Sequence, residues 1–366
     1  MTQSRVFALV TGGGTGGHVT PALAIADALV ARGHDRSSIR FVGAARGLEA
    51  RAVPDAGYAI ELLTLDGIQR SFGFHALVRS ARAVLAFLVA ALRCTGILRR
   101  LRPSVVVGVG GYASAPLVLA ARLLRVPTVI HEQNAVPGLV NRMAVRVGAR
   151  PAVSFAISRW PQAVDTGNPV RAAVCQVARN PASPPMVAIV GGSQGAGRLN
   201  DAGLGMYDRW RYRDDVAVRH VTGPKNFDAC TARLAGLRQP GDRLAYQLVG
   251  FERDMAGLYA SSTLVVCRSG ATTIAEINTV GIPAVYVPWS GAAQDQQRAN
   301  ARAMVQVGAA RMVSDAECDV AHIAPLVEAI LADPEGLHVM AQAAQRAGRP
   351  DAGARIVDLI EECIGG

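Results

Sequence analysis

Two glycine-rich turns constrain this chain more than any other feature. The first covers residues 12–18 (GGGTGGH) and the second covers residues 191–197 (GGSQGAG). Each follows a short apolar run, Val6 to Val10 and Val187 to Val190, and each precedes a helical pattern. Glycine lets main-chain N–H groups approach an anion closely, and a helix N-terminus adds about half a positive charge. The sequence therefore predicts two strand-loop-helix units of the phosphate-binding type, in two similar domains that face one cleft.

Length and composition agree with two folded domains. The 366 residues are enough for two cores, and a chain that is 50% hydrophobic and 18% charged is expected to fold. The six cysteines are scattered without paired spacing, which favours reduced thiols in a cytosolic protein. The first apolar run is too short for a secretory signal and is interpreted as a first strand.

The rhythm of the apolar runs predicts an α/β fold with parallel sheets. Short β-branched runs alternate with helical patterns in both halves of the chain, and the rhythm resumes after the proline-rich stretch at residues 180–185. The expected strands are residues 7–10, 40–42, 105–109 and 128–130, then 187–190, 217–221, 264–267 and 284–287. In open parallel sheets ligands bind beyond the carboxyl ends of the strands, where both glycine turns fall.

The net charge of +10 is concentrated in the first half of the chain. Residues 67–131 contain nine arginines and no acidic residue, and within them an uncharged run, Ala83 to Leu92, lies between Arg82 and Arg93. Ten residues cannot span a bilayer. Two interpretations stay open: a core helix followed by a solvated arginine cluster, or a patch that binds an anionic membrane surface. Aromatic residues for base stacking are not interleaved, so no nucleic acid partner is expected.

The first glycine turn fits a dinucleotide fingerprint only in part. Gly12, Gly14 and Gly17 match G-x-G-x-x-G, but the next strand, residues 40–44, ends without the acid that would hold a ribose. The only lysine is Lys225, so a Walker lysine is also missing. His18 stands in the first turn of the following helix, where the helix terminus should lower its pKa and keep a neutral, exposed imidazole available as a base. A capping or core role for His18 is the alternative.

Three further segments place polar side chains after strands. Residues 131–134 (HEQN) follow the strand at 128–130, and a ligand site or a polar turn would both explain them. Residues 268–276 (RSGATTIAE) follow the strand at 264–267 and begin a helix, so Glu276 is suited to bind both hydroxyls of a ribose or to favour the helix dipole. The amides near Gln296 could bind sugar hydroxyls. The histidines lack paired spacing, so no metal site is expected.

Six motifs, in this order and over nearly the whole chain, resemble one family. They are residues 12–18, 110–116 (GGYASAP), 131–134, 166–171 (TGNPVR), 191–197 and 268–276. Together they are similar to the UDP-N-acetylglucosamine:lipid I N-acetylglucosaminyltransferases of bacterial peptidoglycan synthesis, in glycosyltransferase family 28.

The resemblance implies a GT-B fold of two Rossmann-like domains facing a central cleft. It implies an acceptor-binding, membrane-associated domain at 1–168, a UDP-GlcNAc-binding domain at 169–346, and a segment at 347–366 whose helix crosses back to the first domain. It also implies lipid I as acceptor, no cofactor, and a peripheral position on the cytoplasmic face of the cell membrane.

The same resemblance implies roles for individual residues. His18 would be the catalytic base, and Thr15, Gly16, Gly17 and Asn134 would face the acceptor and the sugar. Ser193 would hold the diphosphate and Glu276 the ribose. The remaining donor-side residues would be Arg171, Ala271, Thr272, Thr273, Ile274, Ala275, Gln296 and Gln297. On the uracil side the family has an aliphatic residue where this chain has Glu252, and a main-chain contact would make the change harmless.

The implied reaction is inverting attack of the muramyl 4-hydroxyl on the anomeric carbon of UDP-GlcNAc. The alternatives are a GT-B transferase with another lipid or small-molecule acceptor, a UDP-sugar epimerase of similar architecture, and a membrane adapter that keeps only the nucleotide-binding fold.

Overall fold

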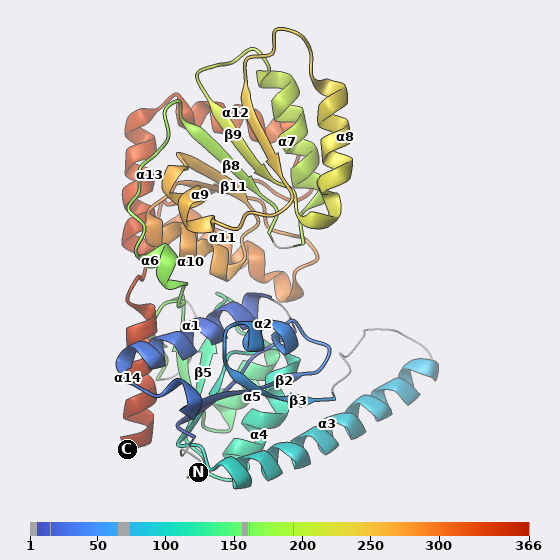
Figure 1. Ribbon diagram of the computed structural model, residues 1–366, viewed down its shortest axis with the longest axis vertical. Helices are drawn as coiled ribbons and strands as arrows, with labels where there is room; N and C mark the ends of the chain where they lie inside the picture. The colour runs from blue at the N-terminus through green and yellow to red at the C-terminus, as the bar shows by residue number, and fades with distance from the viewer. Residues whose placement is uncertain are drawn as a thin grey trace. The chain divides into compact units, whose positions relative to one another are not determined.

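The computed structural model describes residues 6–14, 16–64, 74–155, 160, 162–192 and 194–365, with side chains from residue 85 onward in the helix that begins at Phe74. The chain divides into two compact units (Figure 1). Unit 1 consists of residues 1–170 together with 351–366, and unit 2 consists of residues 171–350. Each unit contains one parallel sheet with helices on its faces.

The sheet of unit 1 has seven strands in the order β3-β2-β1-β4-β5-β6-β7. Its strands are β1 (Ala8–Thr11), β2 (Ile39–Ala44), β3 (Ala59–Leu63), β4 (Val105–Gly108), β5 (Thr128–Glu132), β6 (Arg150–Val153) and β7 (Val164–Asp165). Its helices are α1 (Gly16–Arg32), α2 (Glu49–Asp55), α3 (Phe74–Leu101), α4 (Ala115–Leu123), α5 (Leu139–Arg146) and α14 (Ala352–Gly365). The direction of strand order reverses between β1 and β4, so this is the switch point of a Rossmann-like sheet.

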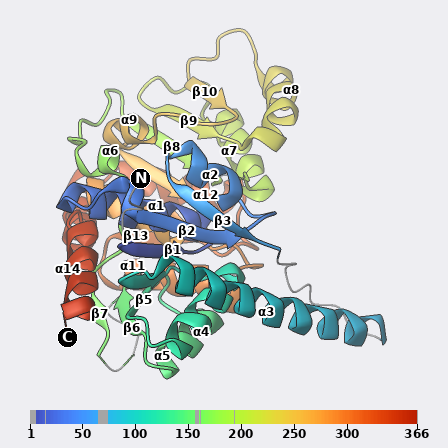
Figure 2. The same ribbon diagram turned by 60° about the horizontal axis from the view of Figure 1, so that its bottom comes forward.

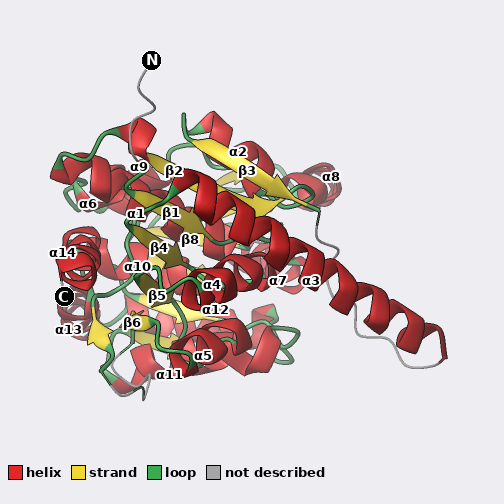
Figure 3. Cartoon of the chain, turned by 90° about the horizontal axis from the view of Figure 1, so that it is seen from below, coloured by secondary structure: helices red, strands yellow, loops and turns green. Residues whose placement is uncertain are grey.

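Alternating side chains of the unit 1 strands build two cores. Ala8 and Val10 face one side, where α1, α2 and α14 cover the sheet, and Leu9 faces the other side, where α3 and α4 pack. Helix α3 buries residues one turn apart, Ala90, Cys94 and Leu98, and its amino-terminal part extends away from the sheet (Figures 2 and 3). No helix among the described residues is long and apolar enough to cross a bilayer.

The last helix of the chain belongs to unit 1. Helix α14 packs beside α1, as Figures 1 and 2 show, and its residues Ile356, Val357, Leu359 and Ile360 are each at most 2% exposed. Arg32 of α1 reinforces this packing through ion pairs, at 2.6 Å to Asp358 and 3.0 Å to Glu361. Of the two domains, the carboxyl-terminal segment therefore completes the first.

The sheet of unit 2 has six strands in the order β10-β9-β8-β11-β12-β13. Its strands are β8 (Met186–Val190), β9 (Ala217–Val221), β10 (Ala245–Val249), β11 (Leu264–Cys267), β12 (Ala284–Tyr286) and β13 (Ala310–Met312). Its helices are α6 (Ala172–Cys175), α7 (Gly197–Trp210), α8 (Phe227–Leu237), α9 (Met255–Ser261), α10 (Ala271–Val280), α11 (Gln296–Gln306), α12 (Val320–Leu331) and α13 (Pro334–Ala347). The switch point lies between β8 and β11.

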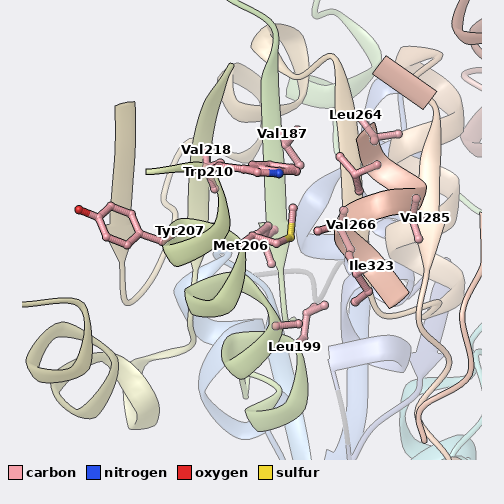
Figure 4. Close-up of a cluster of buried hydrophobic side chains, with 14 of the residues drawn as sticks. Val187, Leu199, Met206, Tyr207, Trp210, Val218, Leu264, Val266, Val285 and Ile323 are labelled. Atoms are coloured by element: carbon pink, nitrogen blue, oxygen red, sulfur yellow. The ribbon is translucent and has the colours of Figure 1, made fainter. Parts of the chain in front are cut away.

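The larger core of unit 2 lies under α7 and α12 (Figure 4). Trp210 and Met206 of α7 and Ile323 of α12 point toward the strand residues Val187 and Val266, and each of these five is at most 1% exposed. The parallel α/β architecture predicted from the rhythm of apolar runs is confirmed, with one Rossmann-like sheet in each unit.

Candidate functional site

The second glycine turn and the segment after β11 emerge side by side at the switch point of unit 2. Strands β8 and β11 are hydrogen-bonded neighbours that pair Val190 with Cys267, so the turn at 191–197 and residues 268–276 start at the same edge of the sheet. Helices α7 and α10 begin there and direct their free N–H groups to this edge. Ser193 lies outside the described residues.

Neighbouring residues pack closely against the second turn. Gly195 has a φ of 76°, and a Cβ there would overlap the main-chain oxygen of Thr222. That oxygen accepts a hydrogen bond from Asn200 Nδ2 at 3.0 Å, and Asn200 Oδ1 lies 3.0 Å from His220 Nε2. Burial lowers the pKa of His220 to about 4, so the side chain that contacts Asn200 is neutral near pH 7.

Glu276 is a buried carboxylate, 6% exposed, on α10. Its Oε1 accepts hydrogen bonds from Arg171 Nε at 3.2 Å and Nη2 at 2.9 Å, and its Oε2 accepts one from the hydroxyl of Tyr259 at 3.1 Å. The structure therefore brings together two of the residues predicted for the donor side, Arg171 and Glu276. It adds Tyr259, which sequence reasoning missed because a tyrosine in an apolar helix carries no distinguishing pattern.

The first turn of α10 is partly open to a ligand. Thr272, Thr273 and Ala275 are half-buried, whereas Ala271 and Ile274 are buried at 8% and 2% exposure. Within the described part of the chain, Thr272 Oγ1 is buried and has no hydrogen-bond partner. Such an atom is expected to gain a partner when a ligand binds.

Gln297 is held in place at the start of α11. Its Oε1 accepts a hydrogen bond from the N–H of Trp289 at 2.9 Å, and its carbonyl accepts one from Ser269 Oγ at 2.8 Å. Gln296 is half-buried beside it. These bonds tie the loop between β12 and α11 to the end of β11, and so bring the predicted sugar-side amides to the same edge as α10.

Both carboxylate oxygens of Glu252 form hydrogen bonds within the protein. Its Oε2 lies 3.1 Å from Arg219 Nε and 2.7 Å from Nη2, and its Oε1 accepts the N–H of Asp254 at 3.1 Å. Glu252, at a position where the resemblance implies an aliphatic residue, is thus paired with Arg219 on β9. A ligand at this position would therefore bind the main chain of Glu252 and not its side chain.

In unit 1 the first glycine turn lies at the switch point between β1 and β4. His18 is the third residue of α1, and its ring lies against Gly110, where a Cβ would be 3.2 Å from His18 Cδ2 and 3.3 Å from Nε2. The prediction of an exposed imidazole is wrong, because His18 is half-buried. Its pKa is lowered as predicted, but burial is the main cause, and the Glu49 carboxylate opposes it. Gly16 is half-buried and Gly17 exposed beside it, while Thr15 lies outside the described residues.

Glu49 is the second residue that sequence reasoning missed. It opens α2, five residues after the strand end where an acid was sought, and is 1% exposed. Its Oε2 accepts the N–H of Gly14 at 3.0 Å and its Oε1 accepts the N–H of Ala44 at 2.9 Å. A carboxylate therefore does reach the first glycine turn, but it accepts a hydrogen bond from the main chain of the turn and not from a ribose.

The four polar residues at the end of β5, residues 131–134, mostly form an internal network. His131, Glu132 and Gln133 are at most 1% exposed, and His131 Nε2 lies 3.0 Å from the oxygen of Gly167. Glu132 Oε1 accepts the N–H of Asn134 at 3.0 Å, and its Oε2 accepts the N–H of Gly138 at 2.8 Å. These bonds account for the side chains of His131 and Glu132 without a ligand, whereas the buried Oε1 of Gln133 has no hydrogen-bond partner among the described residues. Only Asn134 is half-buried.

Two Rossmann-like sheets, each with a glycine turn at its switch point, form the GT-B fold, and the matches to family models identify the class of protein as a glycosyltransferase. The glycosyltransferase family 28 N-terminal domain matches residues 8–152, and the family 28 C-terminal domain matches residues 186–356.

Curated relatives match nearly the whole chain. A UDP-N-acetylglucosamine--N-acetylmuramyl-(pentapeptide) pyrophosphoryl-undecaprenol N-acetylglucosamine transferase of Desulforudis audaxviator is 37% identical, over 98% of each chain. One of the same name from Anaeromyxobacter sp. (strain Fw109-5) is 38% identical, over 97% of this chain and 93% of that one. The crystal structure of Acinetobacter baumannii MurG is similar with a TM-score of 0.77 and 31% identity, over 97% and 99% of the two chains. The chain belongs to this family of N-acetylglucosamine transferases.

Proposed function

We propose that the chain transfers GlcNAc from UDP-GlcNAc to the 4-hydroxyl of the N-acetylmuramyl-pentapeptide of lipid I, which yields lipid II and UDP. The names of the relatives give the donor sugar and the lipid-linked muramyl acceptor. The observation that carries the proposal to this chain is the edge of unit 2, where a glycine turn, two helix N-termini and the buried carboxylate of Glu276 come together.

Unit 2 supplies the donor contacts in this proposal. Ser193 and the N–H groups of its turn take the diphosphate, and the helix N-terminus stabilises the charge that develops on the leaving UDP. Glu276 accepts the ribose hydroxyls in place of part of its bonding to Arg171. Thr272, Thr273 and Ala275 line the nucleotide at the start of α10, with Ala271 and Ile274 shaping that turn from its buried side. Gln296 and Gln297 contact the sugar, and the main chain at Glu252 contacts the uracil.

Unit 1 supplies the acceptor contacts. His18 removes the proton from the attacking 4-hydroxyl, and a half-buried imidazole with a lowered pKa is neutral near pH 7 and able to do so. Thr15, Gly16, Gly17 and Asn134 surround the acceptor. The hydroxyl attacks the anomeric carbon, the bond from that carbon to the UDP oxygen breaks, and the configuration inverts. The N–H groups of the second turn take the role that a metal ion has in other transferases, so no metal or cofactor is assigned.

The membrane contact in this proposal uses α3 and the α4–α5 surface of unit 1. Helix α3 buries Ala90, Cys94 and Leu98 but leaves large apolar side chains outside, with Leu88 at 53% exposure and Leu92 at 70%. Exposed apolar residues on α4 and α5 are Leu123, Leu139, Met143 and Val147, and the exposed cations among them are Arg125, Arg142 and Arg146. One face of α3 is core, and the exposed apolar side chains on its other face support our proposal that this face contacts an anionic bilayer at the cytoplasmic face.

One comparison tests the activity. The protein is incubated with labelled UDP-GlcNAc and a lipid I analogue, and then with the acceptor omitted. We expect labelled lipid II with the acceptor and intact UDP-GlcNAc without it. Conversion of UDP-GlcNAc with no acceptor present would indicate an epimerase, and nucleotide binding with no turnover would indicate an adapter. Turnover with another acceptor only would indicate a transferase of different specificity.

A further inference from the structure

Glu49 fills the position in the first glycine turn that a ligand anion would take. One of its carboxylate oxygens accepts the N–H of Gly14 in that turn, and the other accepts the N–H of Ala44 at the end of β2. A carboxylate accepts and does not donate, so two N–H donors on opposite oxygens match the ionised form. With 1% of the residue exposed, this charge lies inside unit 1.

Three glycines from different segments leave the space that Glu49 occupies. A Cβ at Gly13 or at Gly47 would overlap its carboxyl group, and a Cβ at Gly43 would lie 2.5 Å from its Cγ. None of the three has a positive φ, so conformational freedom does not explain them. The need for space beside Glu49 explains why glycine stands at these three positions, which indicates that the turn packs around this side chain.

The second turn is built differently. Its main-chain bonds among described residues run to carbonyl oxygens, from Gly191 N to Val221 at 3.4 Å and from Gly195 N to Gly192 at 3.0 Å. A turn that already contains a carboxylate repels a diphosphate and accepts a neutral hydroxyl, whereas the neutral carbonyl acceptors of the second turn do not repel an anion.

We propose that Glu49 is a positioning residue: it replaces a ligand anion in the first glycine turn, reserves that turn for a neutral hydroxyl, and fixes the start of α1 that carries His18. This inference rests on the proposed role of His18 as the base. Proton transfer makes His18 a cation, and a nearby negative charge stabilises that cation. Glu49 thus orients the base and also strengthens it.

Two polar side chains lie near Gly14 and Gly110, two glycines of the region around His18. A Cβ on Gly14 would be 3.1 Å from Cε1 of Tyr112, which follows β4. A Cβ on Gly110 would be 3.1 Å from Nδ2 of Asn141 on α5, and this group donates a hydrogen bond to Glu132 Oε2 at 3.0 Å. Among the carboxylates named here, Glu49 is the one that raises the pKa of His18 against the effect of burial.

The test is Glu49→Gln, which keeps the shape and removes the charge. We expect kcat to fall by about tenfold or more, because the base is weaker and one N–H of the pair loses its acceptor. The KM for UDP-GlcNAc should stay within about twofold, since the donor residues are in unit 2. The acid limb of the kcat/KM profile should move to lower pH, because loss of the carboxylate removes the interaction that raises the pKa of His18.

Matched variants separate this role from a loss of folding. Asp27→Asn removes a carboxylate from α1, the helix that contains His18, where Asp27 accepts a hydrogen bond from the Tyr58 hydroxyl at 2.6 Å. This variant should leave the pH profile unchanged. If Glu49→Gln does not fold, Glu49→Asp carries the test: we expect a lower kcat at unchanged donor KM, and wild-type kcat would overturn the proposal.

The proposal fails separately from the proposed function. An NMR titration of His18, assigned with His18→Ala, needs no turnover, and an unchanged His18 pKa in Glu49→Gln overturns the electrostatic role. An equal loss of kcat on Glu49→Gln in wild type and in the His18→Ala background also overturns it, since Glu49 would then act independently of His18. Retention of full kcat by His18→Ala instead refutes the base, whatever Glu49 does.

Discussion

Replacing Glu276 by glutamine tests the donor side most directly. In the structure the carboxylate is 6% exposed and has three donors, two from Arg171 and one from Tyr259. If ribose hydroxyls bind here, the substitution replaces charge-assisted hydrogen bonds by neutral ones and turns one acceptor into a donor. Hydrogen bonds to charged groups contribute about 1.5–3 kcal/mol. At 1.4 kcal/mol for each factor of ten, the Kd for UDP should rise by about 10- to 100-fold.

The assay is calorimetric titration with UDP and with 2′-deoxyuridine diphosphate, on the wild type and on Glu276→Gln. The wild type should prefer UDP, because the deoxy compound leaves a buried carboxylate oxygen without a ligand donor. The variant should lose most of that preference. The difference between the two ligands removes general effects on stability from the comparison.

Glu328 offers a matched control in the same unit. It also bonds to one arginine and one aromatic donor, with Arg209 at 2.8 and 3.0 Å and Trp210 Nε1 at 2.6 Å. Glu328→Gln should lower the stability of unit 2 without changing either Kd. If Glu276→Gln keeps the wild-type preference for UDP over its deoxy analogue, Glu276 does not bind the ribose and the reasoning is refuted.

Three further results are expected. His18→Ala should lower kcat by about 10² to 10⁴-fold at saturating donor while the Kd for UDP is unchanged; an unaltered kcat would remove His18 as the base. Replacing both Leu88 and Leu92 by serine should weaken binding to anionic vesicles at least about tenfold, because each inserted leucine contributes about 1.5 kcal/mol or more. Val339→Ser, at a residue of unit 2 that is 54% exposed, is the control. Equal vesicle binding before and after the double substitution would exclude α3 as a membrane contact. Burial lowers the pKa of His131 from 6.5 to about 4, so His131 binds a proton more weakly in the folded than in the unfolded state. Folding stability should therefore be lost as the pH falls from 6.5 to 4, by up to about 3 kcal/mol at pH 4. Urea unfolding of the wild type and of His131→Asn at pH 7 and pH 4.5 measures this loss, and an equal pH dependence in both proteins would contradict the prediction.

The fold was predictable because its signals are local. Each expected strand is a short, largely apolar run that contains at least one β-branched residue, and β9 and β11 have the predicted bounds at 217–221 and 264–267. The strands that were not predicted, β3, β6, β7, β10 and β13, lie at the edges of the two sheets or next to them. All of them except β6 contain exposed residues, and β6 begins with Arg150 and Pro151, so the apolar run that marks a central strand is weak or interrupted.

Sequence reasoning could predict a site residue only where the residue stands at a fixed distance along the chain from a strand. Glycine turns and Glu276 stand at fixed offsets from a strand, which a sequence displays. The partners that complete them do not: Tyr259 reaches Glu276 from another helix, and Arg219 compensates Glu252 from a neighbouring strand. Glu49 was overlooked because it lies beyond the strand end and turns back. Such pairings depend on tertiary contacts with no spacing rule.

The return of α14 to unit 1 makes the order of synthesis matter. Unit 1 is discontinuous, since its last sixteen residues, 351–366, come after all 180 residues of unit 2. On the ribosome, unit 2 has its whole sequence before unit 1 does, and the apolar surface that Ile356, Val357 and Ile360 later cover stays open until these residues have been synthesised. Unit 1 is therefore begun before unit 2 but completed after it, and a nonsense codon just before residue 351 would damage the unit whose synthesis starts first.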